Sequence, residues 1–145
     1  MKALVQRSGN SSVSVDGSVV GQIEYGLVVF VGFTDTDSIT DIDYIIKKIV
    51  NLRIFDDEYG VMNKSILDVN GQILSISQFT LYANTKKGNR PSYIDAMKGE
   101  EASKLYNIFN EKLKEYTKVK TGVFGADMKV SIVNDGPVTI MLESR

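Results

Sequence analysis

The first half of the chain shows hydrophobic patterns that predict β-strands. Residues 2–7, KALVQR, alternate in polarity, and the segments SSVSV and SVVGQI flank Asp16-Gly17, a pair typical of a β-hairpin turn. Residues 26–33, GLVVFVGF, form an apolar run bracketed by glycines. Such a run predicts a strand that is covered on both faces.

A helix is expected after these strands. Asp37 or Ser38 can cap its start, and the residues LRIF (52–55) then return to strand until the polar run 56–60. The apolar residues that recur at spacings of three and four are Ile42, Ile45, Ile46, Ile49 and Leu52.

The second half predicts one more helix between strands. The alternating segment GQILSISQF (71–79) is expected to be a strand, and VKTGVF, DMKVSIV and VTIML predict three strands at the end of the chain. The helix covers about residues 98–117, and its apolar stripe consists of Ala102, Leu105, Phe109, Leu113 and Tyr116. The pattern predicts an α+β fold, a single domain over residues 1–145 with a mostly antiparallel sheet and two main helices.

The segment NDGPVT (134–139) separates the last two predicted strands and contains one of the two prolines of the chain. Pro137 has no backbone N–H and cannot donate to a strand ladder. One interpretation is a hairpin turn at residues 134–136, with Pro137 starting the last strand. The other is that Gly136-Pro137 has a function of its own, and turn chemistry leaves both interpretations open.

Composition narrows the possible chemistry. The 145 residues contain no cysteine and no histidine, which excludes disulfides, Ser-His-Asp triads and His-ligated zinc within the chain. An enzyme with this sequence has carboxylates, lysine, tyrosine and hydroxyl groups for proton transfer, unless the substrate supplies the group. No segment resembles a signal peptide or reaches the roughly 20 apolar residues of a membrane span, so we expect a cytoplasmic protein without membrane contact.

The net charge of −1 argues against a globally basic nucleic-acid-binding protein. Basic residues nevertheless gather in TKKGNR, where Lys86, Lys87 and Arg90 lie in a polar segment. Such a cluster is either a solvated loop or a contact for phosphate groups.

Ser77, Gln78, Phe79 and Thr80 occupy the end of a predicted strand, a place where scaffolds often present reactive groups. In a purely structural interpretation, Ser77 and Phe79 alternate within the strand and Phe79 lies in the core. In a functional interpretation, backbone N–H groups near Phe79 are free of the ladder and stabilise an oxyanion. Neither Ser77 nor Thr80 has a histidine base, which disfavours a nucleophilic triad.

Six motifs in order carry a resemblance to a known family. They are VQR (5–7), LRIFDDE (52–58), SQFTLYA (77–83), KGNRPS (87–92), FGADM (124–128) and NDGPVT (134–139). Together they extend over essentially the whole chain, which resembles the D-aminoacyl-tRNA deacylases. The two signature motifs of that family are present as Ser77-Gln78-Phe79-Thr80 and Gly136-Pro137-Val138-Thr139.

The resemblance implies hydrolysis of the ester of D-aminoacyl-tRNA, or of glycine on the wrong tRNA, as chiral proofreading in translation. Family members are thought to use the ribose 2′-OH of the tRNA instead of a protein nucleophile, without a metal or a cofactor. The resemblance also implies a barrel-like sheet and a homodimer with active sites at the interface. The protein would then supply positioning and oxyanion stabilisation near Phe79, as suits a chain without histidine or cysteine.

The resemblance further gives Gly136-Pro137 a function. In the family this peptide bond is cis and reaches the active site of the dimer partner, where the two carbonyls would hold the substrate amine and reject an L side chain. Arg7 would brace the motif, with a surface salt bridge as the alternative. Met128 would line the pocket, with plain core packing as the alternative.

Two other classes of function stay open at this point. A dimeric binding module would hold tRNA ends or a small amino acid in the same pocket without turnover. A metal-dependent hydrolase built on Asp56, Asp57 and Glu58 is less favoured, because DDEYG has the composition of a turn.

Overall fold

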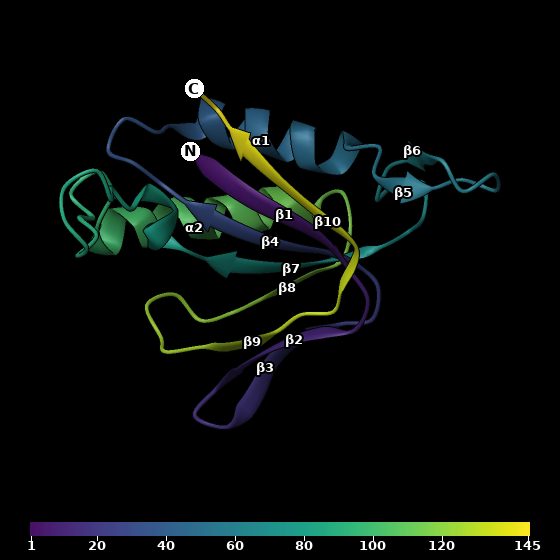
Figure 1. The fold of residues 1–145 in the computed structure, drawn as a ribbon, viewed down its shortest axis with the longest axis horizontal. Coiled ribbons are helices and arrows are strands. Elements are labelled where there is room, and N and C mark those ends of the chain that lie inside the picture. Colours follow the sequence, from purple (N-terminus) through teal and green to yellow (C-terminus); the bar gives the residue numbers. More distant parts are fainter.

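A five-stranded mixed sheet forms the centre of the molecule (Figure 1). The computed structural model describes residues 1–145. The strands follow the order β10-β1-β4-β7-β8, antiparallel from β10 to β4 and parallel from β4 to β8. Their bounds are Lys2–Ser8 for β1, Gly26–Gly32 for β4, Gln72–Ser77 for β7, Val119–Thr121 for β8 and Asn134–Glu143 for β10.

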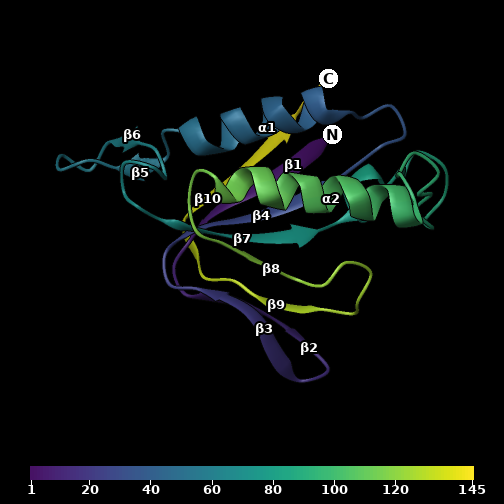
Figure 2. The ribbon, with the colours of Figure 1, turned by 180° about the vertical axis from the view of Figure 1, so that it is seen from behind.

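Two helices cover one face of this sheet (Figure 2). α1 spans Ile39–Asn51 and α2 spans Gly99–Lys114. At the start of α1, the N–H of Ser38 donates to the carboxylate of Asp41 at 2.9 Å, as a helix cap does. A core of 19 buried residues lies between the helices and the sheet, and it includes the four isoleucines predicted on the inner face of α1. Neither helix is both long and apolar enough to cross a membrane.

A smaller antiparallel sheet covers part of the opposite face. It consists of β3 (Ser18–Ile23), β2 (Ser11–Val15) and β9 (Lys129–Ser131). The β2–β3 hairpin turns at Asp16 and Gly17, both of which have positive φ, 50° and 79°, as the predicted two-residue turn requires. The five buried residues between the two sheets are Val13, Ile23, Val28, Leu74 and Ile76.

A short hairpin projects from one end of the central sheet (Figure 1). β5 (Phe55–Asp56) pairs with β6 (Met62–Lys64). Between them, the carboxylate of Asp57 accepts hydrogen bonds from the N–H groups of Tyr59 and Val61 at 2.9 and 3.0 Å, so the turn predicted at DDEYG is confirmed. Of the predicted strand LRIF, only Phe55 lies in a strand. The carbonyl of Ile54, the residue before it, accepts a hydrogen bond from Arg7 instead of a strand partner.

The α+β prediction with a mostly antiparallel sheet is confirmed, since five of the seven strand pairings are antiparallel. The strands do not close into a barrel, because β10 and β8 remain the two edges of the central sheet. Three predicted elements are too long. α2 ends at Lys114, which leaves Tyr116 exposed, and β8 and β9 have three residues each because the chain between them forms a loop.

The predicted hairpin at Asn134-Asp135-Gly136 is wrong. β9 pairs with β2 while β10 pairs with β1, so the two strands belong to different sheets. β10 already begins at Asn134 opposite Ser8, and regular pairing resumes at Thr139 opposite Gln6. Residues 135–138 therefore bulge out of the strand opposite a single residue of β1.

Candidate active site

A cavity of about 560 Å³ opens where β7 ends. Of its 15 lining residues, 9 are hydrophobic. Four residues predicted for the site line it, namely Ser77, Gln78, Phe79 and Met128. A larger groove of about 1030 Å³ lies around the start of β7 and the end of α2, but only 4 of its 13 residues are hydrophobic and it contains none of the predicted ones. The cavity at the end of β7 therefore has the apolar character of a ligand site.

The backbone changes course at this cavity. β7 pairs with β4 as far as Ser77, and the N–H of Gln78 still donates to the Val31 carbonyl at 2.7 Å. The chain then turns into the 3₁₀ helix η1 (Phe79–Tyr82), so the expectation that the strand continues through Phe79 is wrong. The N–H of Phe79 forms no hydrogen bond within the chain, as the first residue of a helix lacks an internal partner.

The ring of Phe79 lies at the surface. It is 54% exposed, which rules out the interpretation of Phe79 as a core residue. The ring packs edge-on against Tyr93, with 5.1 Å between the ring centroids. Both aromatic side chains line the cavity, so together they form an aromatic rim beside the free N–H.

The hydroxyl groups near this rim have no base. Thr80 accepts a hydrogen bond from the amide of Gln78 at 2.5 Å, and the hydroxyl of Ser77 donates to no group in the chain. The charged side chains that line the cavity are Lys98 and Asp127, and Asp127 forms an ion pair with Lys129 at 3.3 Å. This arrangement offers an oxyanion donor and positioning, but no activated protein nucleophile.

Met128 reaches the cavity from the loop between β8 and β9. Its side chain lines the cavity and also packs against the smaller core, so it meets both interpretations made from the sequence. A Cβ on Gly122 would lie 2.6 Å from the Met128 sulfur. The glycine therefore leaves the space in which the Met128 side chain rests.

The Gly136-Pro137 bulge is exposed, and its peptide bond is cis, as the resemblance implied. Gly136 has φ +123°, a conformation that L side chains rarely adopt. A Cβ at this position would lie 2.8 Å from Val138 Cγ2 and 3.0 Å from Arg7 Nη2. The backbone at Gly136 thus has no room for a side chain.

Arg7 braces this bulge from beneath. Its guanidinium donates to the carbonyls of Asp135 at 3.2 Å and Ile54 at 2.8 Å, and it forms ion pairs with the carboxylates of Asp135 and Asp56, both at 3.4 Å. Arg7 is only 7% exposed, so it is not a surface salt bridge. Burial raises the pKa of the nearby Tyr25, Arg7 lowers it, and the carboxylates of Asp135 and Asp56 raise it; the net increase keeps the phenol protonated.

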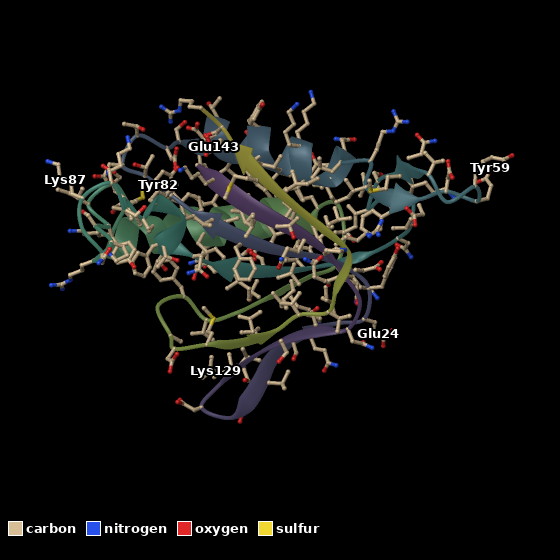
Figure 3. The ribbon with its side chains drawn as sticks, viewed as in Figure 1. Glu24, Tyr59, Tyr82, Lys87, Lys129 and Glu143 are labelled. Carbon is tan, nitrogen blue, oxygen red and sulfur yellow. The ribbon has the colours of Figure 1, made fainter.

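Within one chain, the cavity and the bulge lie at opposite ends of the sheet. Ser77 aligns with Val31, which aligns with Ala3, and Arg7 is four residues further along β1. Four strand residues cover about 13 Å, and β7 and β10 are three strand spacings apart, about 14 Å. Figure 3 shows Lys87 and Lys129 toward the cavity end and Tyr59 and Glu24 toward the other. A single chain therefore does not bring Gly136-Pro137 to Phe79.

The structure adds two aromatic residues that the sequence reasoning missed. Tyr93 and Phe124 both line the cavity, and Phe124 also packs against Tyr106 at 5.9 Å between ring centroids. Tyr93 directly follows the motif KGNRPS, and Phe124 is the first residue of the motif FGADM. Their place in or beside these motifs is the sequence feature that could have identified them. Asp56, Asp57 and Glu58 serve the bulge brace and a turn, and no group of three or more potential metal ligands exists in the chain.

Comparisons with known proteins identify the family of the chain. The family model described as D-Tyr-tRNA(Tyr) deacylase matches residues 4–143. The chain is 56% identical over 146 residues to a D-aminoacyl-tRNA deacylase of Clostridium novyi (strain NT), covering 100% of this chain and 98% of that protein.

Two solved structures are also similar. A c-Myc DNA unwinding element binding protein has a TM-score of 0.95 and 44% identity, covering 100% of this chain and 99% of the other. A probable eukaryotic D-amino acid tRNA deacylase has a TM-score of 0.84 over 98% of both chains, and at 17% identity it shows the shared fold alone. The chain therefore belongs to the D-Tyr-tRNA(Tyr) deacylase family and is a hydrolase.

Proposed function

We propose that this protein hydrolyses the ester bond of D-aminoacyl-tRNA, and of mischarged glycyl-tRNA, to release the free amino acid and tRNA. The observation that carries this proposal is the unpaired N–H of Phe79 beside an apolar cavity. The chain has no histidine or cysteine with which to attack an ester, so a donor for the oxyanion is the contribution that its geometry favours.

In this reaction the 3′-terminal adenosine and its aminoacyl group occupy the cavity. Water adds to the ester carbonyl, and the adjacent ribose 2′-OH assists because neither Ser77 nor Thr80 has a base. The negative charge that develops on the carbonyl oxygen accepts a hydrogen bond from the N–H of Phe79. The bond from the carbonyl carbon to the ribose oxygen then breaks, and that oxygen takes up a proton. One such donor contributes about 10²–10³-fold in rate.

The bulge supplies the selection for chirality in this proposal. The carbonyls of Gly136 and Pro137 hold the α-amino group of the substrate, which leaves an L side chain facing protein and a D side chain facing outward. Glycine has no side chain to reject. The brace on Arg7, with carbonyl contacts at 2.8 and 3.2 Å, supports a fixed position of these carbonyls.

Because the bulge and the cavity lie at opposite ends of one chain, the proposal requires a homodimer with active sites at the interface. A surface suited to this dimer lies on the sheet face that β2, β3 and β9 leave uncovered. There Met141 and Leu4 align across β10 and β1, and Phe30 of β4 continues the row at the edge of the smaller core. Met141 is 46% exposed. An apolar row on an open sheet face favours association with a second copy. The reaction would act as proofreading in the cytoplasm, where aminoacyl-tRNA is used.

The test is to incubate the purified protein with D-Tyr-tRNA and L-Tyr-tRNA and to follow release of free tyrosine. We expect multiple turnovers on the D substrate and little hydrolysis of the L substrate. A non-enzymatic binding module would instead bind D-Tyr-tRNA stoichiometrically without turnover, which would contradict the proposal.

A further inference from the structure

We propose that the loop of residues 84–92, together with Lys98, binds the phosphate backbone of the single-stranded 3′ end of tRNA. This inference rests on the proposed function, in which the terminal adenosine occupies the cavity. The residues that carry it are Lys86, Lys87, Arg90 and Lys98.

These four cations have no partners within the chain. All four are exposed, and none forms an ion pair with a carboxylate. The segment 84–98 that contains them has a single acidic residue, Asp95. Since the whole chain has a net charge of −1, this segment is a local excess of positive charge, as a polyanion site on an otherwise acidic protein requires.

The loop is anchored to the cavity. Asn84 and Ser92 close its base with two backbone hydrogen bonds of 2.8 and 2.9 Å, and the N–H of Lys86 donates to the Asn84 side chain at 3.0 Å. The next residue after the base is Tyr93, which packs on Phe79 at the cavity rim. The cations are therefore carried by the same structure that forms the mouth of the site. Lys98 itself lines the cavity.

The spacing suits an RNA strand that leaves the cavity. Arg90 is three residues from Tyr93, which places it within about 10 Å, and Lys86 and Lys87 lie within about 25 Å along the chain. A strand whose terminal nucleoside is bound in the cavity presents its preceding phosphates to successive cations over this range. Lys87 lies at the outer end of the loop, away from the body of the sheet (Figure 3).

A matched pair of double variants tests this inference. Lys86→Gln/Lys87→Gln removes two adjacent loop cations. Lys47→Gln/Lys48→Gln removes two adjacent, exposed lysines on α1 that form no ion pair with a carboxylate, although Lys48 lies over the Tyr44 ring. Each is assayed on D-Tyr-tRNA and on the D-tyrosyl ester of adenosine alone, over a range of salt concentrations. Binding of uncharged tRNA is measured in parallel.

We expect the loop variant to lose about tenfold in kcat/KM on D-Tyr-tRNA, mainly through a higher KM. A plot of its log(kcat/KM) against log salt concentration should be shallower than that of the wild type by about 1.4. Activity on the adenosine ester should stay unchanged, and the α1 variant should match wild type on both substrates. Equal losses on both substrates, or no loss on D-Tyr-tRNA, would overturn the inference.

Binding of uncharged tRNA separates this inference from the proposed function. If the wild type hydrolyses neither substrate, the proposed function fails, yet weaker tRNA binding by the loop variant alone would still support the loop as an RNA contact. Competition adds a further criterion: a single-stranded RNA oligonucleotide should displace tRNA better than a polyglutamate peptide of equal charge. Equal displacement would show a non-specific anion site and would contradict the inference.

Discussion

The two ends of the central sheet differ in how they hold their functional groups. At the cavity end, an aromatic rim and a free backbone N–H surround an apolar space, and the hydroxyls of Ser77 and Thr80 have no base. At the bulge end, a buried arginine fixes a glycine-containing segment with two carbonyl contacts and two ion pairs. The first arrangement is suited to stabilising a transition state. The second is suited to excluding one enantiomer of a substrate by steric contact.

Under the proposed function, this difference means that neither end forms a complete site by itself. In that proposal, the cavity offers a donor for an oxyanion, and the bulge, which is exposed and braced by Arg7, does not line that cavity. Each of the following variants changes one end, so the effects should fall on rate or on chirality according to the end that is changed.

The largest effect is expected from Phe79→Pro. Proline is tolerated at the first position of a helix and removes the backbone N–H, so we expect kcat on D-Tyr-tRNA to fall about 10²–10³-fold. Phe79→Ala is the control, because it removes the ring but keeps the N–H. Its loss should stay within about tenfold, in line with the energy of one aromatic pair. Equal losses in the two variants would assign the effect to the ring and not to the N–H.

Gly136→Ala should lower the selectivity for D over L substrates. The added methyl would lie 2.8 Å from Val138 and 3.0 Å from Arg7 at a φ of +123°, which forces the bulge to move. We expect the ratio of D-Tyr-tRNA to L-Tyr-tRNA hydrolysis to fall by about 10²-fold, equivalent to about 2.7 kcal/mol. Gly60→Ala is the control, since Gly60 also has positive φ but has no neighbour within 4 Å. An unchanged ratio in Gly136→Ala would remove the bulge from substrate selection.

Arg7→Met should have a smaller effect on the same property. It keeps an apolar stem but loses the contacts to Asp135 and Ile54, so we expect about tenfold lower chiral discrimination and a free energy of unfolding lower by about 2 kcal/mol. Arg53→Met is the control, because Arg53 is exposed and donates to Asn63 on the projecting hairpin. Kinetics on both enantiomers and urea unfolding measure the two quantities. Wild-type discrimination in Arg7→Met would show that the bulge holds its position without the brace.

The smallest effects are expected from Ser77→Ala and Thr80→Ala. Neither hydroxyl has a base to activate it, so each variant should keep at least about a tenth of the wild-type rate. Thr80→Ala also loses the hydrogen bond from Gln78, and it should be the more affected of the two. Isolation of a covalent aminoacyl-enzyme on either residue would contradict this expectation.

Much of the fold followed from local patterns. The isoleucine spacing of α1, the apolar run of β4 and the turn at Asp16-Gly17 are local signals, and each is confirmed. The end of β7 and the bulge in β10 were missed because both depend on partners distant in sequence. Gln78 is held by Val31, and the bulge faces Arg7. Contacts between residues that are distant in sequence produce no periodic pattern of polar and apolar residues.

The site was predictable only in part for the same reason. The motifs around residues 77–80 and 136–139 identified both ends of the sheet, but alternation of polarity placed Phe79 in a strand core, where it does not lie. The burial of the Arg7 side chain could not be predicted either, because its hydrogen-bond partners Ile54 and Asp135 lie 47 and 128 residues away in the sequence. The aromatic rim at Tyr93 required the loop between β7 and α2 to fold back, which no local pattern indicates.

The most direct test of the account is complementation between the two ends. Phe79→Pro and Gly136→Ala chains, each inactive or unselective alone, are co-expressed with different affinity tags, and the mixed dimer is purified. If each active site joins the cavity of one chain to the bulge of the other, one of the two sites in the mixed dimer is wild type, and it should recover about half of the wild-type D-Tyr-tRNA activity with full chiral discrimination. A mixed dimer whose ratio of D-Tyr-tRNA to L-Tyr-tRNA hydrolysis is as low as that of the Gly136→Ala dimer would contradict a site shared between two chains.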